Sequence, residues 1–393
     1  MFVITSMPVG GAETLLVNMM RRMDANRIVP EVACLKEPGP LAAEIASEFT
    51  VHSDLLAAKW DLRVLPRLVR LMHQRRIDAV ITVGAGDKMF WGRLAAHIAG
   101  VPAIGSALHS TGWPDGVGRL NRWLTRITDS FIAVADSHGE FLSDFEKFPS
   151  DKVQVIRNGV DCDRFCPDRD AARSVREELG LAADTPLIGI VAALRSEKNH
   201  SMLVHAAAKV RDEQPNAHWL VIGDGPERAT IEKLSDDLKL NDRIHFLGTR
   251  HDTPRLVSAL DVFTLCSLNE AFPVSILEAL ACQVPVVATD VGSVRESILD
   301  GVTGFLIPSQ DIHAMASCVS KLIASPEQRE SLGKAGRELV LQSGSLQSMV
   351  EGYENLVSRL YDQQAKRYAQ YHQRAPAEIA RLRRSWQATP LRK

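Results

Sequence analysis

The stretch SLNEAFPVSILEALACQVPVVATDVGSVRE (residues 267–296) carries two glutamates, Glu270 and Glu278, in E-x7-E spacing. Pro273 stands between them, and proline is favoured in the first turn of a helix. We therefore expect Glu270 to lie just before a helix, near the positive end of its dipole, where a carboxylate stays ionised. Because an ionised carboxylate only accepts hydrogen bonds, Glu270 suits sugar hydroxyls better than proton donation.

The start of the predicted helix could bind a phosphate. The first backbone N–H groups of a helix, here those of Val274 and Ser275, have no acceptor within the helix. Glu278 follows about one turn later, roughly 6 Å along the axis, where its carboxylate could accept the hydroxyls of a ribose. The stretch thus fits a nucleotide-sugar laid along the helix start. One capping glutamate and one ordinary helical glutamate would give the same spacing, so spacing alone leaves both interpretations open.

Short β-branched runs alternate with amphipathic stretches, and the pattern occurs twice along the chain. It is the βαβ pattern of parallel, doubly wound sheets, so we predict an α/β protein with two Rossmann-like domains. In the first half the predicted strands are residues 2–5, 78–83, 102–108, 130–136 and 152–159, with helices over 12–23, 64–76 and 90–100. In the second half they are 186–194, 218–225, 243–248, 261–267, 284–290 and 304–308, with helices over 200–213, 226–240, 253–260 and 275–282.

The charged, strand-poor segment 163–184 is interpreted as the junction between the two domains. We expect the first domain over residues 1–168 and the second over residues 169–345. A long amphipathic helix over residues 346–372 and a basic tail over residues 373–393 would follow.

The basic tail has two interpretations. The simpler one is a frayed terminus, because chain ends are often poorly ordered. The other is a peripheral contact with acidic lipid headgroups at the inner face of a membrane, with Ile379, Leu382 and Trp386 as its apolar face.

Composition excludes several classes of protein. The 393 residues are 45% hydrophobic with a formal net charge of −2, which does not indicate a nucleic-acid partner. No apolar run approaches the length of a membrane-spanning helix. The N-terminus lacks a basic stretch before its apolar residues, so we expect no signal peptide. Six scattered cysteines suit free thiols and a cytoplasmic location.

A metal site is not expected. Cys162 and Cys166 are close in sequence, but no second Cys/His pair follows at the spacing of a zinc site. Asp161 and Asp163 resemble a D-x-D metal motif, yet they fall at the domain junction rather than after a core strand.

Three further loops are candidates for binding an anion, because ligands of doubly wound sheets bind at the carboxyl ends of the strands. Gly10 and Gly11 precede the first helix, Arg195 and Lys198 precede a helix of the second domain, and Gly223 follows a strand in IGDGP. Ordinary tight turns and a solvated loop explain the same residues. None of the loops matches the G-x-G-x-x-G dinucleotide fingerprint, which leaves a nicotinamide dehydrogenase without support.

Several sequence motifs between Thr5 and about Tyr361, taken together and in this order, resemble those of one family. It is the retaining GT-B-fold glycosyltransferases of family 4 (glycosyl transferases group 1). The resemblance is carried by VGGAE (9–13), GRLAAHIAGVPAIGSALH (92–109), VIRNGVDCDRF (155–165), IGDGP (222–226), FLG (246–248) and above all the block from Asn269 to Pro308.

The resemblance implies two Rossmann-like domains that face a cleft, with the last helix crossing back to the first domain. It implies a donor site in the second domain and an acceptor site in the first. By this resemblance, Glu270 would contact the donor sugar, Glu278 would bind the ribose, and the backbone of Phe272, Val274 and Ser275 would bind sugar and phosphate. Lys198 and a nearby arginine would neutralise the diphosphate. From the first domain, Gly11 would approach the diphosphate closely and His109 would contact the reacting sugar.

Two positions depart from the family pattern. The usual arginine of GRLxxxK is Ala193, so the nearby arginine would be Arg195. The usual glycine of ACGxP is Gln283, which would cost about 1 kcal/mol if the position is left-handed.

We expect glycosyl transfer with retention of anomeric configuration, because no carboxylate pair is placed for double displacement. The donor would be a UDP-, GDP- or ADP-sugar as substrate, with no cofactor and no bound metal. The acceptor would be a saccharide or a lipid-linked sugar in polysaccharide, lipopolysaccharide or glycolipid assembly. The alternatives are a GT-B-fold nucleotide-sugar epimerase or hydrolase, and a protein that binds sugar nucleotides without turnover.

Overall fold

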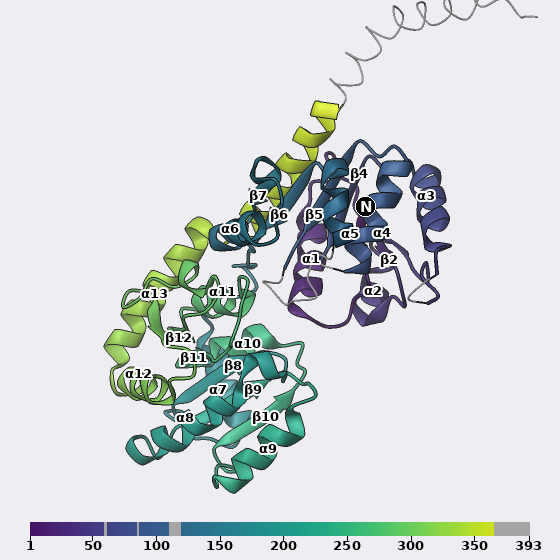
Figure 1. Ribbon diagram of the computed structural model, residues 1–393. Coiled ribbons are helices and arrows are strands. Elements are labelled where there is room, and N and C mark those ends of the chain that lie inside the picture. Colours follow the sequence, from purple (N-terminus) through teal and green to yellow (C-terminus); the bar gives the residue numbers. More distant parts are fainter. Residues whose placement is uncertain (59–60, 85, 110–118, 365–393) are drawn as a thin grey trace, which may run out of the picture.

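The computed structural model describes residues 1–58, 61–84, 86–109 and 119–364. It contains two parallel β-sheets, each with helices packed against it (Figure 1). The strand order is β3-β2-β1-β4-β5-β6-β7 in the first sheet and β10-β9-β8-β11-β12-β13 in the second. Both sheets therefore contain the 3-2-1-4-5-6 order of a doubly wound fold, and the predicted fold class is confirmed.

The first sheet is built from short strands, and its edge strands β3 and β7 are less buried than the others. The strands are β1 (Phe2–Ile4), β2 (Glu31–Cys34), β3 (Thr50–His52), β4 (Ala79–Val83), β5 (Ala103–Ala107), β6 (Ser130–Ala133) and β7 (Val153–Val155). Its helices are α1 (Gly11–Arg22), α2 (Gly39–Ile45), α3 (Val64–Arg75), α4 (Asp87–Ile98), α5 (Arg119–Trp123) and α6 (Asp136–Asp144), with the 3-10 turns η1 (Leu124–Ile127) and η2 (Ser150–Lys152).

The second sheet follows the same plan. Its strands are β8 (Leu187–Val191), β9 (His218–Ile222), β10 (Ile244–Gly248), β11 (Val262–Leu265), β12 (Val286–Thr289) and β13 (Gly304–Ile307). Its helices are α7 (Arg169–Glu178), α8 (His200–Glu213), α9 (Arg228–Asp237), α10 (Thr253–Ser258), α11 (Val274–Ala281), α12 (Ile312–Ala324) and α13 (Pro326–Ser343), with the 3-10 turns η3 (Ser196–Lys198) and η4 (Val294–Glu296).

Two strands of the first sheet, β2 and β3, were not predicted from the sequence. Strand β2 begins with Glu31, an unusual residue for a buried strand, but its carboxylate accepts hydrogen bonds from Arg75 (2.6 Å) and His52 (3.0 Å). Buried charges are tolerated when they are paired in this way. The ion pairs join residues far apart in sequence, so no local pattern predicts them.

Segment 163–184 contains a helix, which the sequence analysis did not expect. Helix α7 begins after Asp168, whose carboxylate accepts hydrogen bonds from the N–H groups of Asp170 and Ala171, both at 2.9 Å. This is the usual capping of a helix start by an aspartate. Val175 of this helix is buried in the apolar core of the second sheet. The exact domain limits stay a prediction.

A last helix, residues 346–364, leaves the second domain and runs back along the first (Figure 1, yellow-green). Its carboxylate at Glu354 accepts a hydrogen bond from the Asp24 N–H (2.7 Å) and pairs with Arg27 (2.8 Å). Near its end, Gln364 donates to Asp129 at 3.0 Å. The crossing helix is thus confirmed.

Several predictions about the C-terminus lie outside the described residues. They are the end of the last helix (365–372) and the basic tail with Ile379, Leu382 and Trp386. Among the residues that the structure describes, no helix combines the length and the apolar character needed to cross a bilayer.

Gln283 occupies a left-handed backbone position after α11, with φ of 60°. The residue is exposed, so its side chain gains no packing in return. The neighbouring helix α13 approaches closely, and a Cβ added to Gly333 would lie 2.0 Å from the Gln283 carbonyl oxygen. The expected strain at Gln283 is therefore confirmed in its geometry.

We predict that Gln283→Gly raises the free energy of unfolding by about 1 kcal/mol, because glycine adopts a left-handed conformation without steric cost. Urea denaturation measures the change. The control is Gln214→Gly, since Gln214 has φ of −128° and glycine there should not stabilise. Equal effects of the two substitutions would contradict the explanation by backbone strain.

Candidate active site

The candidate site lies at the carboxyl ends of the second sheet's strands, where loops from β8 and β11 meet. These strands are neighbours in the sheet. The N–H of Leu268 donates to the carbonyl of Glu197 at 2.8 Å, which ties the two loops together. The Lys198 ammonium then reaches the Glu270 carboxylate at 2.5 Å. Two residues predicted to bind different parts of one ligand are therefore in direct contact.

The hydrogen bonds of Glu270 are concentrated on one oxygen. Lys198 donates to Oε1 at 2.5 Å, and the Ser267 hydroxyl donates to the same atom at 2.6 Å. Ser267 is itself held by Thr289, whose hydroxyl donates to the Ser267 carbonyl at 2.6 Å. No described residue donates to Oε2. The side chain is therefore fixed in place while one oxygen stays available to accept from a ligand.

Helix α11 begins at Val274, one residue before the start of the helix predicted over 275–282. Pro273 is the residue that precedes the helix, rather than part of its first turn, and no side chain caps the helix start. The N–H groups of Val274 and Ser275 therefore have no acceptor within the helix. The Phe272 carbonyl, by contrast, already accepts a hydrogen bond from Asn158 of the first domain at 2.9 Å. Only the N–H of Phe272 remains for the predicted ligand contact.

Glycines let the loops around the site pack backbone against backbone. A Cβ on Gly223 would lie 2.1 Å from the Ala192 carbonyl oxygen, and one on Gly225 would lie 2.4 Å from that of Leu194. A Cβ on Gly292 would lie 1.8 Å from the Glu270 carbonyl oxygen. Backbone packing alone thus requires a glycine at position 223. The presence of Gly223 is therefore not in itself evidence that a base or a ribose binds there.

The first domain contributes Gly10, Gly11 and His109. Gly10 precedes helix α1 in extended conformation, and a Cβ on Gly11 would meet no atom within 4 Å. Packing therefore does not explain a glycine at position 11. His109 follows β5, is half-buried and shares a cavity of about 10 Å³ with Ala12 and Tyr353. His109 and the start of α1 are neighbours.

The second domain approaches this part of the first domain through α11. Val274, at the first position of the helix, packs against the apolar cluster that contains Leu15 and Leu16 of α1. The predicted donor-binding helix therefore starts at the domain interface.

Arg195 lies exposed in the loop before η3, and no ion pair links its side chain to the described residues. It sits three residues before Lys198 on the same loop. An exposed guanidinium without an ion pair can turn toward an anion, since it does not have to leave a partner first. The structure brings Arg195 to the site's edge but does not fix it there.

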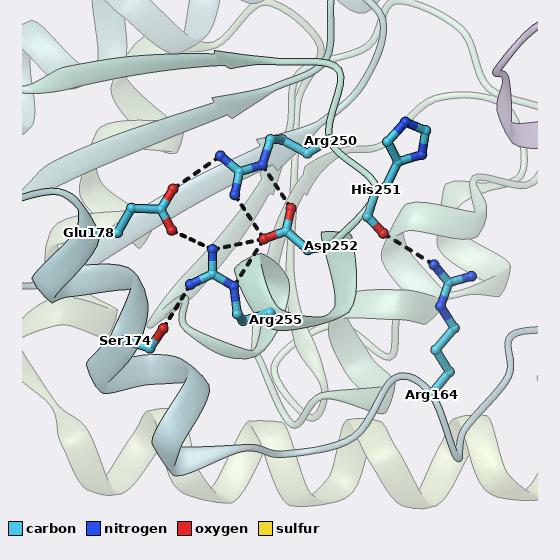
Figure 2. A network of polar contacts seen from close by, with 7 residues as sticks. All are labelled: Arg164, Ser174, Glu178, Arg250, His251, Asp252 and Arg255. Carbon is cyan, nitrogen blue, oxygen red and sulfur yellow. Dashed lines mark hydrogen bonds and ion pairs between the residues drawn. The ribbon is translucent and has the colours of Figure 1, made fainter.

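The loop after β10 is held rigidly beside α7 (Figure 2). Asp252 accepts hydrogen bonds from Arg250 at 2.8 Å and from Arg255 at 2.8 Å, and both arginines also bind Glu178. The hydrogen bond from Arg250, ahead of the other contacts, holds the pKa of Asp252 well below its usual range. Arg164, from the segment between the domains, donates to the His251 carbonyl at 3.4 Å (Figure 2).

The candidate metal ligands have other roles. Asp161 and Asp163 both pair with Arg22, at 3.0 and 3.3 Å. All six cysteines are unpaired. Within the described ranges, no three His, Cys, Asp or Glu side chains gather in a way that could hold a metal ion.

Sequence reasoning missed Ser267, Asn158, Ser293 and Arg164. Each occurs in a motif that was recognised. The partners of Asn158, Ser293 and Arg164 come from distant segments, whereas Ser267 contacts Glu270 three residues away. Spacing can predict which face of a helix a residue occupies, and it cannot predict that Asn158 bonds to Phe272.

Comparison with known proteins identifies the family. The model of glycosyltransferase family 4 matches residues 9–164, and that of glycosyl transferases group 1 matches residues 172–339. The GDP-mannose-dependent alpha-(1-6)-phosphatidylinositol monomannoside mannosyltransferase of Mycolicibacterium smegmatis is 30% identical over 294 residues, 71% of this chain and 76% of that protein. The chain belongs to glycosyltransferase family 4.

Further relatives agree with this assignment. The Escherichia coli UDP-Gal:alpha-D-GlcNAc-diphosphoundecaprenol alpha-1,3-galactosyltransferase is 26% identical over 67% of this chain and 70% of its own length. Anabaena Alr3699/HepE, solved in complex with UDP, superposes with a TM-score of 0.79 at 21% identity, over 91% of this chain and 99% of HepE. The resemblance inferred from sequence is confirmed, and the matches favour a glycosyltransferase over an epimerase, a hydrolase or a binder without turnover.

In this glycosyltransferase, Glu278 is the acidic residue of the site whose carboxylate has the fewest polar partners. It is half-buried on α11, and no hydrogen bond or ion pair links its carboxylate to any described residue. Burial raises the pKa of Glu278 to about 7, and the nearby positive charge of Arg164 offsets only part of that effect. The folded protein thus retains a proton on Glu278 at pH values where the unfolded chain has lost it.

The raised pKa predicts how stability depends on pH. Since the folded state binds more protons, Glu278 costs the protein stability as pH rises from about 4.5 through 7. Glu278→Gln should therefore be close to wild type at pH 5 and more stable by about 2 kcal/mol at pH 8, a figure reduced for partial exposure. Urea denaturation at both pH values tests this. Glu338→Gln, at an exposed glutamate of α13, is the control, and a gain that does not depend on pH would contradict the assignment.

Proposed function

We propose that this glycosyltransferase moves a sugar from a nucleotide-diphosphate sugar to a hydroxyl of a saccharide or lipid-linked acceptor, with retention of anomeric configuration and without a bound metal. The observation that carries the proposal is that, among the described residues, only one of the two carboxylate oxygens of Glu270 accepts hydrogen bonds. Its Oε1 is held by Lys198 and Ser267 beside the open N–H groups of α11, while its Oε2 remains free to accept from sugar hydroxyls.

The donor diphosphate would lie between Lys198 and the start of α11. Lysine has three donors, so Lys198 can keep its bond to Glu270 and still contact a phosphate. The N–H groups of Val274 and Ser275 suit phosphate oxygens. Glu278, one turn further along the same helix, would accept the ribose hydroxyls. Arg195 could also bind the diphosphate from its exposed loop. It would then replace the arginine that the family usually has at the position of Ala193.

Gly10 and Gly11 would face the same diphosphate from the first domain. The absence of packing around Gly11 supports this role, because a side chain there would occupy space that nothing in the protein fills. His109, beside the start of α1, would contact the reacting sugar from the same side. No observation supports a ligand contact for Gly223 beyond its place in the loop.

The proposed reaction breaks the bond between the anomeric carbon and the diphosphate oxygen. The acceptor hydroxyl forms the new bond on the face that the diphosphate leaves, and its proton passes to the departing diphosphate. Lys198, Arg195 and the dipole of α11 would stabilise the developing negative charge. Preorganised charges of this kind usually supply the largest part of the rate enhancement. They also provide the positive charge that a divalent metal would otherwise supply.

The relatives support a nucleotide-sugar donor and suggest the acceptor class. One uses GDP-mannose and phosphatidylinositol monomannoside, and another uses UDP-galactose and a diphosphoundecaprenol-linked sugar. Because their donors differ in base and in sugar, the donor of this chain has to be found by experiment. Both acceptors are lipid-linked, which favours a membrane-bound acceptor here as well.

The donor class is tested by thermal unfolding in the presence of UDP-, GDP- and ADP-sugars. A ligand at about 100 times its Kd stabilises the folded state by about 2.7 kcal/mol, so one nucleotide class should raise the Tm clearly. Glu278→Ala should abolish the shift, and Glu338→Ala should keep it. If no nucleotide sugar shifts the Tm of the wild type, the proposed donor site is wrong.

The stereochemistry is tested on the product. Incubation with the donor found above and a hydroxyl acceptor should give a product whose anomeric configuration, read from the proton coupling constant in NMR, equals that of the donor. The same reaction with EDTA should proceed at an unchanged rate. An inverted product, or loss of activity that a divalent cation restores, would refute the corresponding part of the proposal.

A further inference from the structure

One carboxylate joins the two domains at the start of a helix. Glu296, in η4 of the second domain, accepts hydrogen bonds from the N–H groups of Asp136 and Ser137, both at 2.8 Å. These are the first two residues of α6 in the first domain, and Ala135, the residue before the helix, offers no side-chain cap. The Ser137 hydroxyl also donates to Glu296 at 2.5 Å. A helix of one domain thus obtains its cap from the other.

An arginine completes the contact. Arg157 of the first domain pairs with Asp136 and lies 3.7 Å from Glu296. The Glu296 side chain is only 17% exposed, so its charge depends on these partners. Capping by a carboxylate combines hydrogen bonds with the favourable field of the helix N-terminus. The contact is therefore stronger than an ordinary pair on the surface.

The segment that contains Glu296, residues 292–296, also packs directly against the backbone of Glu270. The N–H of Ser293 donates to the Glu270 carbonyl at 3.2 Å. Gly292 packs so closely on that carbonyl that no side chain fits. The hydroxyl oxygens of Ser293 and Ser137 lie 2.9 Å apart, and since the one Ser137 proton goes to Glu296, the Ser293 hydroxyl is the donor of this hydrogen bond. Two residues, Ser293 and Glu296, thus connect the backbone of Glu270 with the start of α6.

A second contact flanks the Glu270 loop on its other side. Asn158 of the first domain donates to the Phe272 carbonyl at 2.9 Å. The loop from Ser267 to Pro273 is therefore held from the first domain at two points, directly at Phe272 and through Ser293 at Glu270. Any change in the arrangement of the domains has to break or shift these contacts.

We propose that Glu296 is a positioning residue, which by capping α6 of the first domain holds the Glu270 loop in place opposite the acceptor side. Glu296 itself does not touch the substrates. Its effect on the reaction rests on the function proposed above, since it acts through Glu270. Its effect on the loop does not, because the contacts that transmit it are made between protein groups.

Hydrogen–deuterium exchange tests the positional effect without any substrate. In Glu296→Ala, we expect amide exchange to become about tenfold faster both in residues 136–140 and in residues 267–273. Glu354→Ala is the matched control, because Glu354 also accepts from a backbone N–H and pairs with an arginine, but lies on the last helix away from Glu270. It should leave residues 267–273 unchanged. Faster exchange confined to residues 136–140 would overturn the proposal and reduce Glu296 to a local cap.

Kinetics separate positioning from a merely structural role. With the donor identified by thermal shift, Glu296→Ala should lower kcat about tenfold and leave the Kd of the free nucleotide within about twofold. Glu296→Gln, which keeps one accepting oxygen, should fall between Ala and wild type. Ser137→Ala should have a smaller effect, and adding it to Glu296→Ala should cost little more, since the two residues share one contact. An unchanged kcat, or fully additive effects, would overturn the proposal.

The two proposals fail in different ways. If no nucleotide sugar binds to the wild type, the proposed function fails while the exchange experiment still decides the role of Glu296. If the donor binds and is turned over equally by wild type and Glu296→Ala, the proposed function stands and the positioning role falls.

Discussion

The ion pair between Lys198 and Glu270 is the contact on which the arrangement of the site depends. It joins loops from two neighbouring strands of the second sheet, and its atoms lie 2.5 Å apart. Glu270 is nearly buried at 9% side-chain exposure, so removing the lysine would leave a buried negative charge. Breaking such a pair costs about 3–5 kcal/mol when both partners are buried, and the 24% exposure of Lys198 lowers the cost here. The pair therefore fixes both loops at once.

Close backbone packing makes this contact possible. Glycine at positions 223 and 225 lets the loop after β9 lie against residues 192–194, which places the following Lys198 toward the β11 loop. Gly292 does the same for the loop after β12 beneath Glu270. Close backbone packing is enough to explain these glycines, because it brings the chain segments together. The polar side chains can then meet because the backbones that carry them are held within a few ångströms of each other.

Much of this was predictable from the sequence, and the limits have physical causes. Helix α8 was predicted with the bounds that the structure has, because its apolar residues recur at helical spacing, and the strained conformation of Gln283 followed from a missing glycine. Strand β2 was missed because its stabilising partners, Arg75 and His52, come from distant segments. The site was predictable at the level of motifs, since Glu270, Lys198 and α11 do converge. The Lys198–Glu270 pair and the cap of α6 by Glu296 were not, because both depend on tertiary contacts.

The distribution of unsatisfied polar groups argues for where a ligand binds. Arg93, fully buried in the first domain, has no carboxylate partner among the described residues, but it donates to Met89, Thr128 and Asn121, so the fold satisfies its hydrogen-bonding groups. Around α11 the pattern is the opposite, since Oε2 of Glu270, the carboxylate of Glu278 and the first N–H groups of the helix all lack partners among the described residues. A single unsatisfied group would prove little, because the buried His200 also lacks a described partner and lies in the core. What distinguishes this region is that acceptors and donors alternate from the Glu270 loop into α11, in the order that the sugar hydroxyls, the phosphate and the ribose hydroxyls of a nucleotide-sugar would require. The protein leaves these groups open at a cost in stability, and a ligand of that composition is what would satisfy them together.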